Sequence, residues 1–404
     1  MASRERGAGG VQDTAGSENS ENRRCISNMT TSVSSLIYPV PKGWRLYTAG
    51  DIKSTEPHSC VAGPFGSKIS SKYFVDDGVP IIRGNNLKDD LTRFVPNGFV
   101  FVSDARAQEY RPQHVRGGDL VFTCWGTIGQ VGLIPEDGPY PEYIISNKQL
   151  KLRVASSIAD PRFCFYYFAS PRYAEYVRSR SIGGAVPGIN LGILKSLAIA
   201  LPPITVQRRI ADVLSGYDDL IENNRRRMAL LEDSARKLYN EWFVRLRFPG
   251  YEHTPITNGV PEGWKRKPLE ALCMEGDGIQ TGPFGSQLHQ SDYSEDGIPV
   301  VMPKDLIGFR ISVSSIARIP EDLGSPETAG VIANRAKGAT MPNLNTSLLR
   351  SVPILIAPRR LQEIYAEQAD TATQLCDVLD EQNQRLRTAR DLLLPRLMSG
   401  ELAV

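Results

Sequence analysis

The chain has 404 residues, and about 100–200 residues per domain predicts two or three domains. Its hydrophobic content of 41% and charged content of 23% exclude a wholly disordered or collagen-like chain. The net charge is only +2, but residues 41–200 carry 19 basic and 14 acidic side chains, whereas residues 251–357 carry 9 and 12. The basic front half permits nucleic-acid binding without requiring it.

The cysteines and histidines predict no disulfide framework and no metal site. The six cysteines lie far apart without a Cys-x-x-Cys pair, and the four histidines are scattered. The sequence also shows no signal-peptide pattern and no apolar run of about 18 residues. We therefore expect a cytoplasmic protein with reduced cysteines and no membrane span.

The N-terminal segment differs in composition from the rest. Residues 1–35 are rich in Ser, Asn, Gly and charged side chains, which predicts a disordered extension. Met29 is an alternative start to Met1, because the first repeated motif follows soon after it.

Residues 36–200 predict a first globular domain of mixed α/β type. Short apolar stretches lie between clusters of Gly, Pro, Asn and Asp, which predicts strands in a loop-rich fold. The aromatic run 163–168 predicts a buried helix or strand rather than a base-stacking platform. The predicted strands are 79–82, 99–102, 120–122, 144–145 and 150–154.

Residues 201–250 predict a long helix that pairs with another helix. Over 204–246 the apolar positions alternate in steps of four and three residues, which is the seam of a coiled coil. Asn224 is the polar member of this seam and is expected to fix its register. A helix of about 40 residues is about 60 Å long, too long to pack only on its own domain. The predicted pairing residues are Ile210, Leu214, Tyr217, Ile221, Asn224, Met228, Leu231 and Leu238.

Residues 251–357 repeat the first domain in a shorter form. The motif at 41–44 returns at 261–264, and the Gly-Pro-Phe-Gly-Ser motif at 63–67 returns 219 residues later at 282–286. Further along, residues 170–190 match 325–345, an offset of 155. The second copy is therefore shorter by 219 − 155 = 64 residues, and the missing part corresponds roughly to residues 105–169.

The C-terminal segment 358–404 predicts a second long helix. It keeps the same spacing with more polar members, and its pairing residues are predicted as Leu375, Leu379, Leu386 and Leu393. The expected fold class is α+β. Two tandem mixed α/β domains are separated by long helices that form an antiparallel coiled coil with pseudo-two-fold symmetry.

No recognisable motif predicts catalysis. The loop at 63–68 lacks the Gly-x4-Gly-Lys-[Ser/Thr] spacing of a phosphate-binding loop, and no Gly-x-Gly-x-x-Gly or Asn/Asp-Pro-Pro-Tyr/Phe motif is present. The paired carboxylates at 76–77 and 89–90 stand beside turn residues, which favours solvated loop charges. The sequence therefore predicts a binding protein, with no metal ligands and no catalytic residues.

Residues 36–404 resemble the specificity (S) subunit of type I restriction-modification enzymes. The similarity is most specific in the motifs Leu-Pro-Pro at 201–203, Gln-Arg-Arg-Ile-Ala at 207–211 and Leu-Leu-Leu-Pro-Arg-Leu at 392–397. It implies that residues 36–200 and 251–357 are target recognition domains that each read half of a split site in double-stranded DNA. It further implies that the helices dock two modification (methyltransferase) subunits, which restriction subunits join. S-adenosylmethionine, ATP and Mg²⁺ are then expected on those partners and not on this chain.

Candidate DNA-contacting residues follow from side-chain chemistry, because Arg, Lys, Asn and Gln read base edges and hydroxyl groups contact phosphates. A solvated-loop role is an equally good interpretation for each of them. The candidates in the first domain are Lys68, Lys72, Arg83, Asn85, Asn86, Lys88, Thr123, Trp125, Thr127 and Lys148, and those in the second are Gln287, His289, Lys304 and Lys337.

The shortened second domain leaves alternatives open. An internal deletion could leave a recognition domain that reads its half-site poorly, or the short domain could serve as a cap while the first domain reads DNA. We expect impaired recognition of the second half-site. Two other functions remain as alternatives to a specificity subunit: a coiled-coil scaffold without DNA specificity, which the acidic back half supports, and an enzyme that methylates or cuts DNA by itself.

Overall fold

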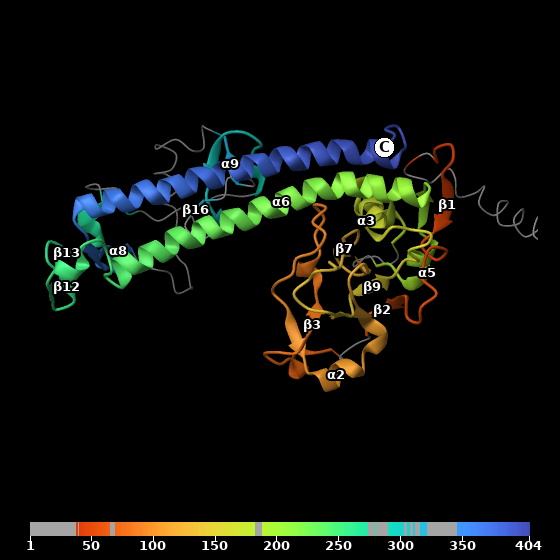
Figure 1. Cartoon of the computed structure of the whole chain (residues 1–404), viewed down its shortest axis with the longest axis horizontal. Helices are drawn as coiled ribbons and strands as arrows, with labels where there is room; N and C mark the ends of the chain where they lie inside the picture. Colours follow the sequence, from red (N-terminus) through yellow and green to blue (C-terminus); the bar gives the residue numbers. More distant parts are fainter. Residues whose placement is uncertain are drawn as a thin grey trace, which may run out of the picture. The chain divides into compact units, whose positions relative to one another are not determined.

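The computed structural model describes residues 38, 40–64, 69–181, 188–273, 279, 290–302, 305–307, 310–311, 316–320 and 346–404. The chain divides into two compact units: unit 1 comprises residues 1–221 and 384–404, and unit 2 comprises residues 222–383. Both boundaries fall inside the long helices α6 (Ile204–Tyr239) and α9 (Arg359–Met398), so each unit contains part of both helices (Figure 1). The domain limits given by the sequence stay a prediction, and the predicted disordered extension lies outside the described residues.

The described strands of unit 1 form a two-stranded ribbon, β1-β10, and two four-stranded sheets of order β2-β9-β6-β7 and β4-β3-β8-β5. All the stretches predicted as strands in residues 36–200 are strands here, with ends that shift by one or two residues. The strands are β1 (Arg45–Thr48), β2 (Cys60–Ala62), β3 (Val79–Ile82), β4 (Val100–Val102), β5 (His114–Val115), β6 (Leu120–Thr123), β7 (Val131–Leu133), β8 (Tyr143–Ile145), β9 (Gln149–Leu152) and β10 (Ala198–Leu201).

The aromatic run is a helix at the centre of unit 1. Helix α3 (Pro161–Ala169) begins with Asp160, whose carboxylate accepts hydrogen bonds from the backbone N–H groups of Arg162 and Phe163 at 2.9 and 3.1 Å. Every residue from Phe163 to Ala169 is buried, which confirms the prediction of a core element. The other helices of this region are α2 (Asp104–Gln108), α4 (Pro171–Ser179) and α5 (Leu191–Ser196), with 3-10 turns η3 (Ser71–Tyr73), η4 (Gly84–Asn86) and η5 (Arg111–Gln113).

Helices α6 and α9 pack antiparallel, as predicted. In unit 1, Asp218 of α6 contacts Arg390 of α9, and Ile210 and Leu214 share a core with Leu394 and other residues near the end of α9. In unit 2, Asn224 contacts Asn383, and further along α6 the carbonyl of Ala235 meets the hydroxyl of Tyr365. In both units, residues further along α6 contact residues nearer the start of α9. The two helices therefore run antiparallel.

The predicted seam of α6 is buried or half-buried throughout, whereas that of α9 needs a correction. Leu379 is buried and Leu386 and Leu393 are half-buried, but Leu375 is 48% exposed and Cys376 beside it is buried. The face of α9 that meets α6 includes polar residues that form hydrogen bonds to α6. An apolar pattern does not register such residues, and it therefore predicted Leu375 as a pairing residue where the buried residue is Cys376. Asn224, for example, donates to Asn383 Oδ1 at 3.0 Å, and both side chains are buried.

Unit 2 repeats several features of unit 1. Strand β13 (Lys265–Pro268) pairs with β18 (Pro353–Ile356) as β1 pairs with β10, and β14 (Ile298–Val300) pairs with β17 (Ala317–Ile319) as β3 pairs with β4. Its other described elements are β11 (Ile256–Thr257), β12 (Val260–Pro261), β15 (Leu306–Ile307), β16 (Arg310–Ile311), α8 (Thr346–Arg350), the π-helical turn η6 (Asn240–Val244) and the 3-10 turns η7 (Tyr251–His253), η8 (Leu269–Leu272) and η9 (Gln290–Asp292).

The equivalence of the two copies extends to their glycines. Gly78 and Gly297 both have positive φ angles, 144° and 122°, in the turn before the paired strand. A Cβ atom would lie 2.3 Å from the Val102 carbonyl oxygen in the first copy and 2.2 Å from that of Ile319 in the second. Glycine is therefore required at both places, since any side chain would collide with backbone. In the described part of the chain no helix has the length and apolar composition needed to cross a membrane.

Candidate nucleic-acid interface

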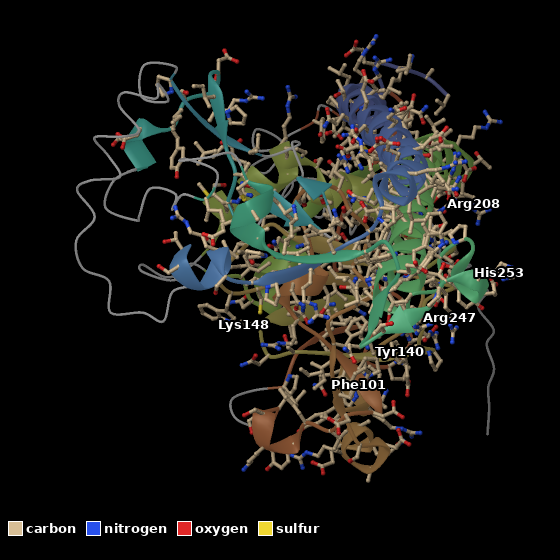
Figure 2. All side chains as sticks on the ribbon, turned by 90° about the vertical axis from the view of Figure 1, so that its left-hand side faces the viewer. Phe101, Tyr140, Lys148, Arg208, Arg247 and His253 are labelled. Carbon is tan, nitrogen blue, oxygen red and sulfur yellow. The ribbon has the colours of Figure 1, made fainter. Side chains whose placement is uncertain are left out.

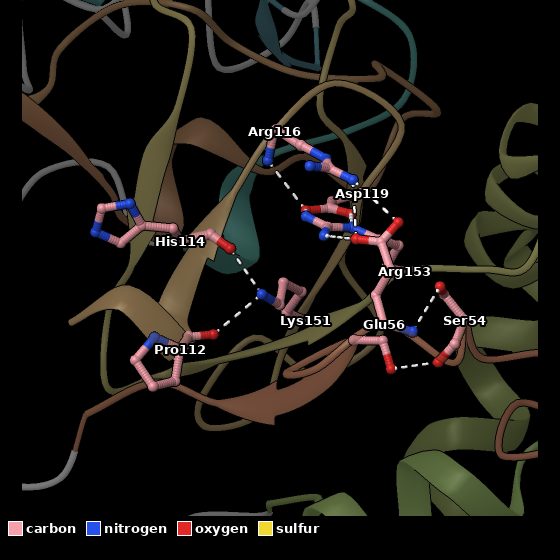
Figure 3. A network of polar contacts seen from close by, with 9 residues as sticks. Ser54, Glu56, Pro112, His114, Arg116, Asp119, Lys151 and Arg153 are labelled. Carbon is pink, nitrogen blue, oxygen red and sulfur yellow. Dashed lines mark hydrogen bonds and ion pairs between the residues drawn. The ribbon is translucent and has the colours of Figure 1, made fainter.

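A partly buried polar network holds one end of the sheet β2-β9-β6-β7 (Figure 3). The Asp119 carboxylate is fully buried and accepts from Arg153 Nε and Nη2, both at 2.7 Å. The Glu56 carboxylate accepts hydrogen bonds from Arg153 Nη1 at 2.8 Å and from Arg116 Nη2 at 2.9 Å. Because a bidentate arginine–carboxylate pair is strong and directional, this network fixes where β6 begins and β9 ends.

Lys151, in the middle of β9, joins the two four-stranded sheets. Its side chain is buried, and Nζ donates to the carbonyl oxygens of Pro112 at 3.0 Å and His114 at 2.7 Å, which lie at strand β5 of the other sheet (Figure 3). Burial lowers the pKa of Lys151 to about 8. No sequence pattern pointed to this residue, because a lysine in a strand is normally solvated.

We expect Lys151 to contribute a rise in the free energy of unfolding as the pH increases from about 8 to about 10, the interval between its folded-state pKa and the usual lysine value of about 10.4. Burial raises the pKa of the Cys124 and Cys164 thiols, which contribute a fall over the same range, so the effect of Lys151 is the difference between the wild type and Lys151→Met. In that interval the folded state has already released the proton that the unfolded state still binds. The rise should be absent in Lys151→Met. Urea denaturation of both proteins across this pH range tests the expectation, and parallel curves would contradict it.

The other end of the same sheet brings together backbone from four distant segments. The N–H of Gly63 donates to the Gln149 carbonyl at 2.8 Å, and that of Cys124 donates to the Lys148 carbonyl at 2.8 Å. The N–H of Ile189 in turn donates to Cys124 at 3.0 Å. These bonds place the beginning of the first Gly-Pro-Phe-Gly-Ser loop beside the loops that follow β6 and β8.

Two glycines allow this close approach. A Cβ atom on Gly63 would lie 1.7 Å from the carbonyl oxygen of Ser146, and one on Gly188 would lie 2.5 Å from the indole ring of Trp125. Both loops would have to move if either glycine carried a side chain. Packing at this end of the sheet thus explains the first glycine of the motif at 63–67.

Three predicted DNA-contacting residues meet at this end. Trp125 is 44% exposed, and Thr127 and Lys148 are exposed beside it. In Figure 2, Lys148 lies apart from Phe101 and Tyr140, which belong to the other sheet and its flank. An exposed aromatic ring beside a lysine suits duplex DNA, because apolar groups contact thymine methyl groups in the major groove and phosphates attract ammonium groups. Thr123, by contrast, is buried, and its hydroxyl lies 3.4 Å from Gln130 Oε1, so it offers no surface to a ligand.

The predicted loop at 83–88 is the turn η4. Arg83, Asn85 and Lys88 are exposed on it. Asn86 is fully buried and is a structural residue instead of a surface contact: its Nδ2 donates to the carbonyl oxygens of residues 95 and 97 at 2.9 and 2.8 Å, and its Oδ1 accepts from the Arg83 N–H at 2.8 Å. An asparagine amide can satisfy several backbone groups at once, which a sequence pattern does not reveal.

The segment after this turn is clamped onto both long helices within unit 1. Leu91 has a positive φ of 62° and is 3% exposed, and it packs in the same core as the start of α6 and the end of α9. Arg390 Nη2 of α9 donates to the Asp90 carbonyl oxygen at 3.1 Å, and Arg93 forms an ion pair with Asp219 of α6. A strained, buried leucine between two arginine contacts fixes the position of the turn with Arg83 and Lys88. No sequence signal pointed to this clamp.

Among the remaining predicted residues, Lys72 is the one that the structure describes, and it is not brought to either place. Lys72 is exposed in η3, where its Nζ lies 4.7 Å from the ring centroid of Tyr73. Lys68, Gln287, His289, Lys304 and Lys337 lie outside the described residues. Across the residues the structure describes, no cluster of three or more His, Cys, Asp or Glu side chains could hold a metal ion.

Comparison with known proteins gives a consistent family. The model of the type I restriction modification DNA specificity domain matches residues 66–233. The HindI specificity subunit of Haemophilus influenzae is 30% identical over 89% of this chain and 99% of its own length. The MjaIX specificity subunit of Methanocaldococcus jannaschii is 21% identical over 90% and 95%. A crystal structure of an S subunit from M. genitalium has a TM-score of 0.48 and 15% identity over 88% of this chain and 96% of that one.

Proposed function

Because the chain belongs to the family of type I restriction-modification specificity subunits, which bind a DNA target, we propose that it reads a target in two parts. Residues 36–200 read one half and residues 251–357 the other. The observation that carries this proposal is the repeated build of the two units, in which β1-β10 and β13-β18 have matching registers. Paired reading units suit paired half-sites, as in other symmetric DNA-binding proteins.

Within the first unit, we propose that DNA meets the end of the sheet β2-β9-β6-β7 where Trp125, Thr127 and Lys148 are exposed. Arg83, Asn85 and Lys88 on the clamped turn, together with Lys72, remain candidates for further contacts. The convergence of loops from four segments supports this placement, because DNA-contacting groups are effective when rigid elements hold them.

The chain itself is the non-catalytic subunit of such a system. We propose that two modification subunits bind to α6 and α9 and that restriction subunits join them, all acting on DNA in the cytoplasm. S-adenosylmethionine, ATP and Mg²⁺ then belong to those partners. Large apolar side chains exposed on the two helices support docking, since solvated helices seldom carry many. They include Leu220 at 52%, Leu230 at 69% and Leu392 at 67% exposure.

We further propose that the second half-site is read less well than the first. Strands β6, β7 and β9, which build the proposed DNA-binding end of unit 1, lie in residues 105–169, the part without a counterpart in the second copy. The net charge of −3 for residues 251–357 also disfavours phosphate binding.

The test is to co-express the chain with its modification subunits and to map methylated positions across the host genome by single-molecule sequencing. A two-part motif with a fixed gap would support reading by both units and would contradict the impaired second half-site. A motif with only one half would support reading by the first unit alone. A stable complex without methylation would contradict the specificity role, and purification without partners would favour a scaffold of another kind.

A further inference from the structure

The ribbon at the start of each copy is the same structural element in two different surroundings. In the first copy Arg45 of β1 pairs with Leu201 of β10, and in the second Lys265 of β13 pairs with Ile356 of β18. The turn before each ribbon is also the same, because Trp44 and Trp264 each donate their N–H to a proline carbonyl at 3.1 Å. Differences between the two ribbons can therefore be compared position by position.

The first ribbon is covered by the core of its unit. Ile199, Ala200 and Leu201 of β10 are buried, and the hydroxyl of Tyr167 in α3 accepts from the Ala200 N–H at 3.4 Å. Helix α3 lies within residues 105–169, for which the sequence predicts no counterpart in the second copy. The matching residues of β18, Ile354 to Ile356, are only half-buried. The second ribbon thus has a more open surface than the first.

The side chains of the second ribbon differ in chemistry as well. Positions Leu46 and Tyr47 of β1 are half-buried, and their counterparts in β13 are Arg266 and Lys267. With Lys265 they make three consecutive basic residues, all exposed. Among the residues that the structure describes, none of the three takes part in an ion pair, although Glu262 and Glu270 flank the strand. This basic strand stands out because residues 251–357 are acidic overall.

From this contrast we propose that β13 is a sequence-independent binding surface for the phosphate backbone of duplex DNA, formed by Lys265, Arg266 and Lys267. Side chains alternate across a strand, so Lys265 and Lys267 project to one face about 6.6 Å apart and Arg266 projects to the other. Exposed, unpaired cations gain affinity by releasing the counterions of DNA and carry no base specificity by themselves. The proposal rests on the proposed function in taking DNA as the partner. It gives the shortened unit a way to hold DNA that it reads poorly.

The test measures binding of the purified full chain to a short duplex of arbitrary sequence over a series of salt concentrations. The variant Lys265→Thr/Arg266→Thr/Lys267→Thr keeps residues that favour a strand and removes three charges. Its slope of log affinity against log salt should be shallower than that of the wild type by about 2–3, since each phosphate contact contributes about 0.9. The variant Lys265→Thr/Lys267→Thr should account for about two-thirds of this change.

A matched control removes three exposed basic residues of α6 that are already paired with carboxylates: Arg226→Gln/Arg236→Gln/Lys237→Gln. Its slope should stay near that of the wild type. Equal slopes for wild type and the β13 variant would overturn the proposal, as would self-association of the variant with unchanged DNA binding, because the charges would then only protect an exposed strand edge. If single-stranded RNA competes better than duplex DNA, the assigned ligand is wrong. Methylation mapped in the assembled complex tests the proposed function separately.

Discussion

Replacing Asp218 by leucine is expected to lower the free energy of unfolding by about 3 kcal/mol, the largest stability effect of any single change considered for unit 1. Asp218 Oδ1 accepts a hydrogen bond from Arg390 Nη1 at 2.6 Å, and the side chains of Asp218 and Arg390 are only 9% and 4% exposed, respectively. The hydroxyl of Tyr166 donates to the other carboxylate oxygen at 2.5 Å. Without Asp218 the Arg390 guanidinium would keep only Asp391 at the rim as a charged partner, beside its hydrogen bond to the Asp90 carbonyl oxygen, and a buried charge without its main partner is strongly destabilising.

The double variant Asp218→Leu/Arg390→Met should recover at least half of that loss, because no unpaired charge remains in the core. Recovery should be incomplete, since the Tyr166 hydroxyl and the Asp90 carbonyl oxygen still lose a partner each. Urea denaturation of the wild type, both single variants and the double variant gives the coupling energy. Strictly additive losses would contradict a coupled pair.

The control for this cycle is Asp212→Ala. Asp212 pairs with Arg162 at 2.8 Å in the same unit, but the two side chains are 64% and 35% exposed. Solvent screens such a pair, so its loss should cost less than about 1 kcal/mol. Burial explains the difference between the two carboxylates. It raises the pKa of Asp218 even with Arg390 beside it, so the stability of the ionised Asp218 side chain depends on that arginine.

Replacing Trp125 by alanine, or Lys148 by glutamine, is expected to weaken target binding by about 5- to 150-fold each, which corresponds to the loss of about 1–3 kcal/mol for a specific contact to a base pair. The measurement is the Kd of the complex between this chain and its modification subunits. It is determined for a duplex with the target that methylation mapping identifies and for a duplex of unrelated sequence. If Lys148 contacts phosphate, both values rise together. If it contacts a base edge, only the value for the target rises.

Lys53→Gln is the matched control for Lys148→Gln. Lys53 is also exposed, but it bridges to Val154, six residues along from Lys148 and therefore about 20 Å away at the other end of the sheet. Its replacement should leave both Kd values unchanged. Equal losses for the two lysine variants would indicate a general charge effect and would contradict an interface localised at Trp125 and Lys148.

Much of the fold follows from the sequence. Five of the ten described strands of unit 1, the buried aromatic segment that forms α3 and the two long helices α6 and α9 come from local patterns, because side-chain periodicity reports which face of an element is buried. The repeat was also visible, and its ribbons and glycine turns have matching geometry in both units. The family followed from motifs that lie mainly on the helices.

What only the tertiary structure decided are the positions where a polar side chain is buried. Residue type alone favours the surface for Asn86, Lys151, Asn383 and Arg390, yet each is buried and bonded to groups elsewhere in the chain. The error of one residue in part of the α9 seam has the same origin, since Leu375 fits the apolar pattern and Cys376 is the buried neighbour. Hydrophobic patterning is local, whereas the partner that makes a buried polar group tolerable is supplied by the fold. The sequence alone therefore determined five strands of unit 1, the two long helices and the pairing of these helices, and the tertiary contacts decided which polar residues hold the elements together.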